Sequence, residues 1–481
     1  MMKVLETVNN IVWGIPALVL ILGIGLYLSI RTGFAQIRFF PRALGRFLAR
    51  LRRRDTSQGV SPFQALCTAL AATVGTGNLA GVAGAMAIGG PGAIFWMWVC
   101  GILGMMTKYA EATLAVRYQV CHPDGTCSGG PMHMITRGLG PRWRPLALCY
   151  CFFGVIASFG VGNCTQINAV LTGIREVSRT LGYEGGRGFD LCLGILFGIL
   201  VVAMLLGGAR RIGEAAEKLV PFAAGLYILL AAGVLVVRGN QIPRAVMSIL
   251  SGAFSPRAVT GGTIGSVFLV LRVGISRGVF TNEAGMGTAS IAHGSTRVRH
   301  PAEQGLMGIM EVFLDTLVIC TMTALVILVS GTPIPYGIDE GLALTNRAFA
   351  SVYGGWISVV ITLETCCFAF ATILGWGLYG ARCAEFLFGK NVWKAFALVQ
   401  GIAVVFGAVW DTGTVWLLAD TVNGLMAIPN LVALVMLSPE LVRLTASYRL
   451  IHQPRTLGQQ LGSGKDEDDV AKLPVPPSSA F

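Results

Sequence analysis

The chain has 481 residues, of which 54% are hydrophobic and only 12% charged, and its formal net charge is +12. Such a composition is typical of a protein with many membrane-spanning segments and excludes an ordinary soluble domain. The positive charge does not indicate a nucleic-acid partner, because most Lys and Arg residues lie in short loops beside apolar segments, where they orient the spans. Glycine, at 63 residues, is about twice as frequent as the usual ~7% and favours close helix packing.

Eleven apolar segments are long enough to span a bilayer. They cover residues 11–31, 61–89, 92–118, 145–176, 188–207, 217–238, 258–294, 305–330, 355–381, 393–410 and 413–437. The first segment has no small-residue cleavage site, so we expect a permanent helix rather than a signal peptide. The sequence therefore predicts an all-α polytopic membrane protein.

Charged residues between the segments predict the orientation. The loop after the first segment carries eight arginines and a single acid, Asp55, and we expect it in the cytoplasm, in contact with anionic membrane lipid. Later basic loops fall on the same side, and the acidic loop at Asp339 and Glu340 falls on the other. We therefore expect an integral protein of the plasma (inner) membrane, with the N-terminus outside and the C-terminus cytoplasmic.

Cysteines and the C-terminal tail suggest no chemistry. Nine of the twelve cysteines lie inside apolar segments, and we expect reduced, structural thiols. Cys121, His122 and Cys127 share one expected cytoplasmic loop, but their spacing matches no zinc pattern. Beyond Pro439 the chain is polar, and we expect a disordered tail.

Two of the segments are interrupted by glycine and polar residues, at 71–81 and at 278–287. A helix broken inside hydrocarbon exposes backbone groups, and such a break persists only where those groups face a cavity and bind something. Breaks at matching places in two halves favour an inverted-repeat secondary transporter. We therefore expect an extra N-terminal helix and basic loop over 1–60, five-helix repeats over 61–240 and 241–438, and the tail over 439–481.

The first break can hold an anion and a cation side by side. Unwinding here leaves the amides of Thr76 and Gly77 at the positive end of the following half-helix, where a carboxylate is favoured. The carbonyls of Ala71, Thr73 and Val74, at the end of the preceding half-helix, suit a small hard cation. The alternative for this segment is a glycine-rich packing face.

Several longer motifs resemble the alanine or glycine:cation symporter family. They are residues 73–83, 89–98, 108–111, 278–287, 315–321 and 369–376. The resemblance implies a leucine-transporter-like fold and sodium-coupled, sometimes proton-coupled, uptake of small neutral amino acids. The core of the first break is also similar to the unwound helix of neurotransmitter:sodium symporters, in which amides bind the substrate carboxylate and flanking carbonyls bind sodium.

Two further spans add candidate side chains. Gln166 fits a neutral polar contact to the substrate, with an interhelical hydrogen bond as the alternative. Phe368, Thr372 and Trp376 form one helical stripe, in which Thr372 offers a hydroxyl to a cation and Trp376 a wall that limits substrate size. The alternative for Trp376 is a core aromatic. Ala371 stands where the family often carries Ser or Thr, which removes one possible sodium oxygen.

Taken together, the breaks and the resemblance define two sets of site residues. We expect substrate contacts from Gly75, Thr76, Gly77, Asn78, Gln166, Phe280, Thr281, Asn282 and Trp376. We expect sodium ligands among Ala71, Thr73, Val74, Phe368 and Thr372.

Intramembrane acids form a second tier of candidates. They are Glu283, Glu311, Asp315 and Glu364. Arg272 and Arg277 flank the second break, so a structural salt bridge is at least as plausible there as a proton relay.

The expected function is sodium-driven symport of alanine or glycine by alternating access, with sodium as the coupling ion. A proton-coupled symporter of another small neutral amino acid is one alternative. A channel is the alternative from another class, although two broken helices around one pocket argue against it. We do not expect an enzyme, because the sequence offers five histidines and no nucleophile–base arrangement.

Overall fold

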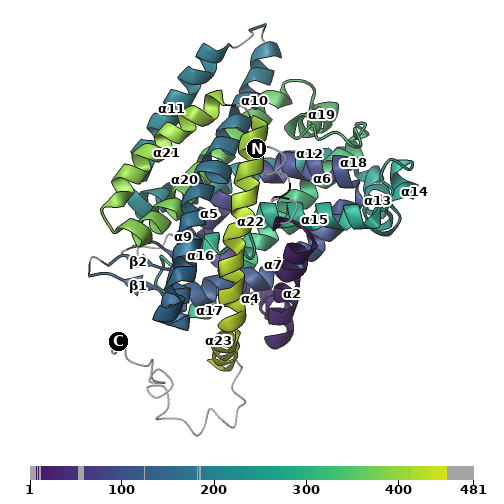
Figure 1. Cartoon of the computed structure of the whole chain (residues 1–481). Coiled ribbons are helices and arrows are strands. Elements are labelled where there is room, and N and C mark those ends of the chain that lie inside the picture. The colour runs from purple at the N-terminus through teal and green to yellow at the C-terminus, as the bar shows by residue number, and fades with distance from the viewer. Residues whose placement is uncertain are drawn as a thin grey trace.

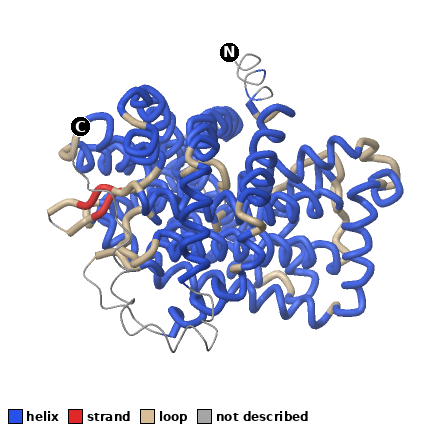
Figure 2. Tube along the Cα trace, turned by 90° about the horizontal axis from the view of Figure 1, so that it is seen from below, coloured by secondary structure: helices blue, strands red, loops and turns tan. Residues whose placement is uncertain are grey.

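The computed structural model describes residues 12–52, 59–123, 125–180, 182–183, 186–410 and 412–451, together with Thr7 and Asn9. Nearly all of this part of the chain is helical. A single two-stranded hairpin, β1 (Val120–Cys121) paired with β2 (Cys127–Ser128), projects from one edge of the helical body (Figure 1, Figure 2).

The first half of the chain begins with α2 (Ile15–Arg31), α3 (Ala35–Arg38) and α4 (Phe40–Arg52). It continues with α5 (Pro62–Thr73), the π-helical turn η1 (Gly77–Gly81), α6 (Val82–Gly89), α7 (Gly92–Arg117), the hairpin, α8 (Pro131–His133), η2 (Met134–Leu139) and η3 (Pro141–Trp143). The half ends with α9 (Arg144–Phe159), η4 (Gly160–Cys164), α10 (Thr165–Thr180), α11 (Arg187–Leu205) and α12 (Gly208–Val237).

The second half begins with η5 (Gly239–Gln241), α13 (Ile242–Phe254), α14 (Pro256–Thr260), α15 (Val267–Asn282) and α16 (Thr288–His293). Next come α17 (Pro301–Val312), η6 (Phe313–Cys320), α18 (Thr321–Ser330) and α19 (Leu342–Tyr353). It closes with α20 (Ile357–Phe388), α21 (Val392–Val409), α22 (Thr412–Met436) and α23 (Ser438–Ile451).

Each of the eleven expected segments is helical over most of its length. Within the described ranges, seven helices are long and apolar enough to cross a membrane, and two bent pairs raise the number to nine. The difference from eleven lies in α2, which is shorter than the other spans, and in α15 with α16, which the second break divides. On α12 the side chains of Val236, Leu229 and Phe222 are 82%, 69% and 66% exposed, as expected of a face that lipid covers.

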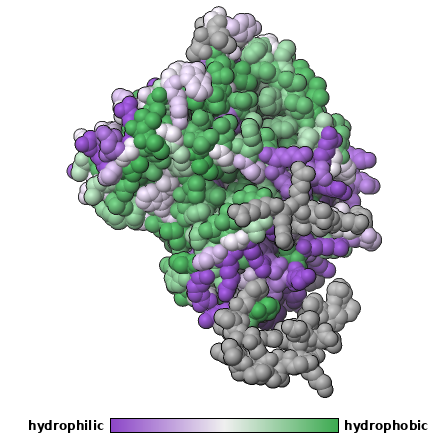
Figure 3. Space-filling view, turned by 180° about the vertical axis from the view of Figure 1, so that it is seen from behind, coloured by the Kyte–Doolittle hydropathy of each residue, from purple (hydrophilic) through white to green (hydrophobic). Residues whose placement is uncertain are grey.

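Hydrophobic residues cover most of the face in Figure 3, and hydrophilic ones gather at its two side edges and in its lower part. Helix α7 lies at the centre of the bundle, where it packs against both α15 and α17. Gly308 lets α17 approach α7 closely, because a Cβ at this position would lie 2.8 Å from the carbonyl oxygen of Lys108. Helices α11 and α21 pack side by side at one edge of the molecule (Figure 1).

Two expectations are corrected. The polar segment after Pro439 is helical as far as Ile451, because α23 buries Leu441, Thr445 and Tyr448 against the bundle; the expected disorder of residues 452–481 lies outside the described residues. Cys121 and Cys127 are not free thiols but form a disulfide across the hairpin. The other ten cysteines are free.

Candidate substrate and cation site

The first break lies deep inside the bundle. Ser61 caps the start of α5 in a capping box with Gln64, and the helix ends at Thr73 because Val74 is extended, with φ −77° and ψ 97°. The following half-helix is bent by 52° from α5. The side-chain Oδ1 of Asn78 accepts a hydrogen bond of 2.9 Å from the backbone N of Gly75 and so caps the break.

Two other helices meet this break, as the sequence predicts. Thr372 on α20 donates its hydroxyl to the carbonyl of Ala71 at 2.8 Å, and Thr76 donates to Oε1 of Gln166 on α10 at 3.2 Å. A Cβ on Gly75 would lie 2.8 Å from Oγ1 of Thr372 and 3.6 Å from Oε1 of Gln166. Only glycine lets the three helices approach this closely.

The second broken span borders the same place. A Cβ on Gly77 would lie 3.3 Å from the methyl group of Thr281 and 3.5 Å from the ring of Phe280, both on α15. The structure therefore gathers six of the nine expected substrate residues around one buried spot. They are Gly75, Thr76, Gly77, Gln166, Phe280 and Thr281.

Asn78 and Asn282 hold the two breaks together through Asp315. Nδ2 of Asn78 donates to Oδ1 of Asp315 at 2.6 Å, and Oδ2 of Asp315 accepts from the hydroxyl of Thr316 at 2.8 Å. That hydroxyl accepts from Nδ2 of Asn282 at 3.1 Å, and Oδ1 of Asn282 accepts from the backbone N of Ala284 at 3.0 Å. These bonds form a continuous path from one break to the other.

Trp376 faces the second break rather than open space. Its indole Nε1 donates to Oε1 of Glu283 at 2.9 Å, and its side chain packs directly on Gly162, where a Cβ would overlap it. Only 1% of the Trp376 side chain is exposed. The expected wall residue is therefore also bonded to an intramembrane carboxylate, which the sequence pattern alone does not reveal.

The expected sodium ligands lie along the junction of α5 with α20. The hydroxyl of Thr372 and the carbonyl oxygen of Ala71 lie 2.8 Å apart there. Val74 and Phe368 are each 1% exposed, and the hydroxyl of Thr73 is bonded within its own helix, to Ala69 at 3.1 Å, which leaves its carbonyl as the relevant atom. At such breaks, unwound backbone carbonyls coordinate sodium, and the Thr372 hydroxyl is a further oxygen at this junction.

Glu111, on α7, is the main residue that the sequence reasoning missed. Its Oε1 accepts hydrogen bonds of 3.0 Å from the backbone N of Gly285, 3.0 Å from that of Gly287 and 2.7 Å from Nδ2 of Asn430. The backbone reaches this geometry through positive φ values of 95° at Gly285 and 77° at Gly287. An acid inside an apolar span was the available signal.

The remaining intramembrane acids have different surroundings. Glu311 is paired with Lys108 at 2.8 Å and with His293 at 3.0 Å, which makes it a buried ion-pair residue. Both oxygens of Glu364 are buried without a polar partner among the described residues. Outside the core, Arg277 pairs at 3.2 Å with Asp339, which is not one of the four intramembrane acids for which the sequence suggested a salt bridge.

Other parts of the chain cover one end of the broken span, and a cavity lies at its other end. On the α6 side, a Cβ on Gly84 would lie 2.6 Å from the carboxylate of Asp339, and Thr345 on α19 donates to the carbonyl of Leu79 at 3.0 Å. On the α5 side lies a cavity of about 910 Å³ between the hairpin, the α11–α12 turn and the end of α20, reaching Gly377 beside Trp376.

Electrostatics at the cavity wall are dominated by basic groups. Burial, reinforced by the positive charges of Arg137 and Arg382, lowers the pKa of His133 to about 4. The imidazole is therefore neutral at pH 7, where its Nε2 bonds to the hydroxyl of Ser128 at 3.3 Å. Arg382 is itself paired with Glu385 at 2.7 Å.

Comparisons with known proteins find relatives over almost the whole chain. Over 451 residues the chain is 42% identical to an uncharacterised transporter of Haemophilus influenzae, covering 93% of this chain and 96% of that one. It is 41% identical to the sodium/alanine symporter AgcS of Methanococcus maripaludis, over 94% of this chain and 98% of that one.

A solved structure matches the fold, and a family model matches the sequence. The structure of MhsT in complex with L-phenylalanine superposes with a TM-score of 0.55 at 15% identity, covering 82% of this chain and 99% of that one, which confirms the leucine-transporter fold. The model of the sodium:alanine symporter family matches residues 1–459. The chain therefore belongs to the sodium:alanine symporter family.

Proposed function

We propose that this protein couples the inward movement of sodium to the uptake of alanine or glycine, by alternating access about the first break. The observation that carries the proposal is the convergence of Gly75, Thr76, Gln166 and Thr372 at one buried spot. Binding and conformational change, rather than covalent chemistry, carry this function.

The site suits a small zwitterion. The start of the half-helix at Thr76 and Gly77 favours the substrate carboxylate, and Oε1 of Gln166 is an acceptor for the substrate ammonium. The ring of Phe280 and the methyl of Thr281 lie within van der Waals range of a Cβ on Gly77, so little volume remains for a side chain. Alanine and glycine fit this restriction better than large amino acids.

Sodium between Ala71 and Thr372 would join two parts that move relative to each other. Ala71 belongs to the first half-helix, whereas Thr372 belongs to α20 of the second half of the chain. A cation that takes oxygens from both stabilises the conformation in which α5 rests against α20. Coupling then follows, because sodium and substrate favour the same conformation and so raise each other's affinity.

The proposed location is the plasma (inner) membrane, with the end that carries α4 and the hairpin in the cytoplasm. Helix α4 has an apolar side with Phe40 and Phe47 packed on the core, and its arginines lie where anionic lipid headgroups would be. The cavity of about 910 Å³ then opens toward the cytoplasm.

Uptake by proteoliposomes tests the function. Purified full-length protein is reconstituted, and radiolabelled alanine uptake is measured with an inward sodium gradient, with potassium in place of sodium, and with an inward proton gradient alone. We expect accumulation above equilibrium only with the sodium gradient. Accumulation driven by protons without sodium would support the proton-coupled alternative, and equilibration without accumulation under every gradient would support a channel.

A further inference from the structure

The β1–β2 hairpin forms part of the cavity wall and has no role in the site described above. Its two strands are linked by the Cys121–Cys127 disulfide, and His122, Cys127 and Ser128 line the cavity of about 910 Å³. The hairpin follows α7, which runs back from the α6 end of the broken span, so it lies at the α5 end of the molecule.

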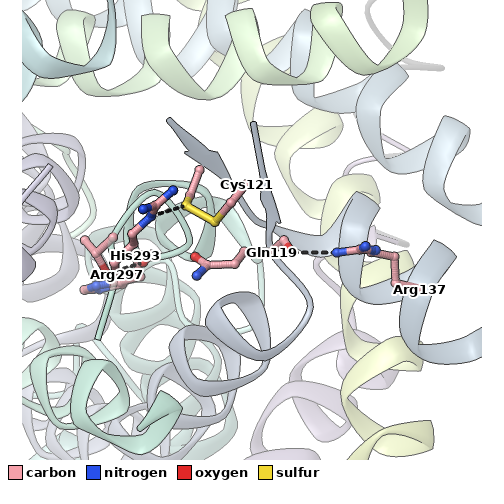
Figure 4. The surroundings of a disulfide bond; sticks show 7 residues. Gln119, Cys121, Arg137, His293 and Arg297 are labelled. Carbon is pink, nitrogen blue, oxygen red and sulfur yellow. Dashed lines mark hydrogen bonds between the residues drawn. A yellow bond between two sulfur atoms is a disulfide. The ribbon is translucent and has the colours of Figure 1, made fainter. Parts of the chain in front are cut away.

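The two sulfur atoms have different surroundings. Cys121 is exposed at the surface of the hairpin, whereas Cys127 is 3% exposed. Nε of Arg297, in the segment after α16, donates to Sγ of Cys127 at 3.3 Å (Figure 4). One sulfur is therefore open to attack, and the other lies against a fixed positive charge.

We propose that this disulfide is a redox site, which thiols of the cytoplasm reduce and which in its oxidised form slows the transport cycle. The proposal rests on the orientation given under the proposed function. Disulfides that form in a reducing compartment are usually transient and sense the redox state. A redox-sensing disulfide suits this surface hairpin, in which the two cysteines are only six residues apart and which borders a cavity.

The unequal surroundings give the exchange a direction. A thiolate of the reductant attacks Sγ of Cys121, a new sulfur–sulfur bond forms, and the Cys121–Cys127 bond breaks with its electron pair on Cys127. Arg297 stabilises the departing thiolate, and a better-stabilised leaving group departs faster. A second thiol of the reductant then releases Cys121. In balance, two thiols are oxidised to one disulfide, and two electrons and two protons reach the protein.

The hairpin is attached to elements on different sides of the cavity. Arg137 in η2 donates to the carbonyl of Gln119 at 2.6 Å, and Nζ of Lys390, just before α21, lies 3.2 Å from Nδ1 of His122. The backbone just after β2 also touches the backbone just after α16, because a Cβ on Gly129 would lie 2.5 Å from the Cα of Gly294. The intact disulfide keeps these attachments in one arrangement, and its reduction lets them move separately.

The expected consequence is a change in rate rather than in affinity. The cavity wall must move when the α5 end closes, and α16 belongs to the second broken span, but neither sulfur lies at the substrate site. Reduction should therefore raise the maximal rate of alanine uptake at least about twofold and leave the half-saturating alanine concentration unchanged.

The test uses full-length protein in proteoliposomes, oxidised with diamide or reduced with either glutathione, a monothiol, or dithiothreitol, a dithiol. Alkylation followed by mass spectrometry reports the state of both cysteines, and uptake is measured on the same samples. The double variant Cys121→Ser/Cys127→Ser should transport like reduced protein under all conditions. Cys149→Ser removes an exposed free cysteine instead, and it should respond to diamide and thiols as the parent does.

A second variant tests the direction of exchange. Arg297→Gln should slow the reduction of the disulfide by dithiothreitol several-fold, because the Cys127 thiolate loses its cation, and Arg299→Gln is the matched control. The thiol readout does not depend on the transported substrate. Equal uptake by oxidised and reduced protein, or two cysteines that are alkylated fully even after diamide, would overturn the proposal and leave the proposed symport intact.

Discussion

Thr372 makes the contact on which the proposed sodium site depends, because Ala371 beside it offers no side-chain oxygen. The variant Thr372→Val keeps the shape of the side chain and removes the hydroxyl that bonds to Ala71. We expect the sodium concentration for half-maximal uptake to rise several-fold, and saturating sodium to restore most of the alanine affinity, since the two bindings are reciprocally linked.

Thr372→Ser is the matched control, because it keeps the oxygen and loses only a methyl group. Its sodium dependence should stay close to that of the parent. If both variants keep the parental sodium dependence, the cation does not bind at the junction of α5 with α20.

Trp376 stabilises the second break through its indole N–H. Trp376→Phe keeps an aromatic ring on Gly162 and removes the donor to Glu283, so a buried carboxylate oxygen loses its partner. Leaving such a group unsatisfied costs about 1–3 kcal/mol. We expect a lower midpoint of thermal unfolding in detergent, whereas Trp356→Phe, at a position 60% exposed, should leave it unchanged. A parental midpoint for Trp376→Phe would mean that the Glu283 contact adds no stability.

At the scale of a helix, Glu111 also stabilises the second break, because its carboxylate holds the unwound backbone between α15 and α16. Glu111→Ala leaves the backbone N–H groups of Gly285 and Gly287 without their acceptor. We expect a loss of about 3 kcal/mol or more, visible as a large drop in the midpoint of thermal unfolding.

The conservative variant Glu111→Gln keeps an acceptor oxygen and should recover much of this stability. Glu303→Gln is the control for loss of a carboxylate, because Glu303 forms a partly exposed pair with Arg46 and should contribute at most about 1 kcal/mol. Equal midpoints for Glu111→Ala and Glu303→Gln would contradict the assigned role.

The same elements show what a sequence can and cannot predict. Glycine and polar residues inside an apolar span identified the break at Gly75, and helical spacing placed Thr372 on a face that contacts Ala71 in the structure. The partners of Glu111 lie 174 to 319 residues away, and no local pattern reports such distances. Helix α23 was missed for a related reason: its composition is polar, and its stability comes from Tyr448 packing on Phe39 with ring centroids 5.6 Å apart.

At the scale of the whole molecule, the orientation in the membrane is the next property to test. A cysteine-depleted protein carries one new cysteine, either Ala49→Cys on α4 or Ile338→Cys in the loop before α19, both at exposed positions. We expect a membrane-impermeant maleimide to label Ile338→Cys in intact cells, and to label Ala49→Cys only after the cells are opened. The reverse pattern would place the N-terminus in the cytoplasm.

The carboxylate of Glu111 in the second break also limits how many substrate molecules one chain can hold. The Gly285 and Gly287 amides, which would otherwise attract a free amino acid, already face an acid that belongs to the protein. Of the two interrupted helices, only the first has its amides open to an incoming carboxylate under the proposed function. Equilibrium binding of labelled alanine should therefore reach saturation at one molecule per chain, although the fold contains two breaks of similar kind.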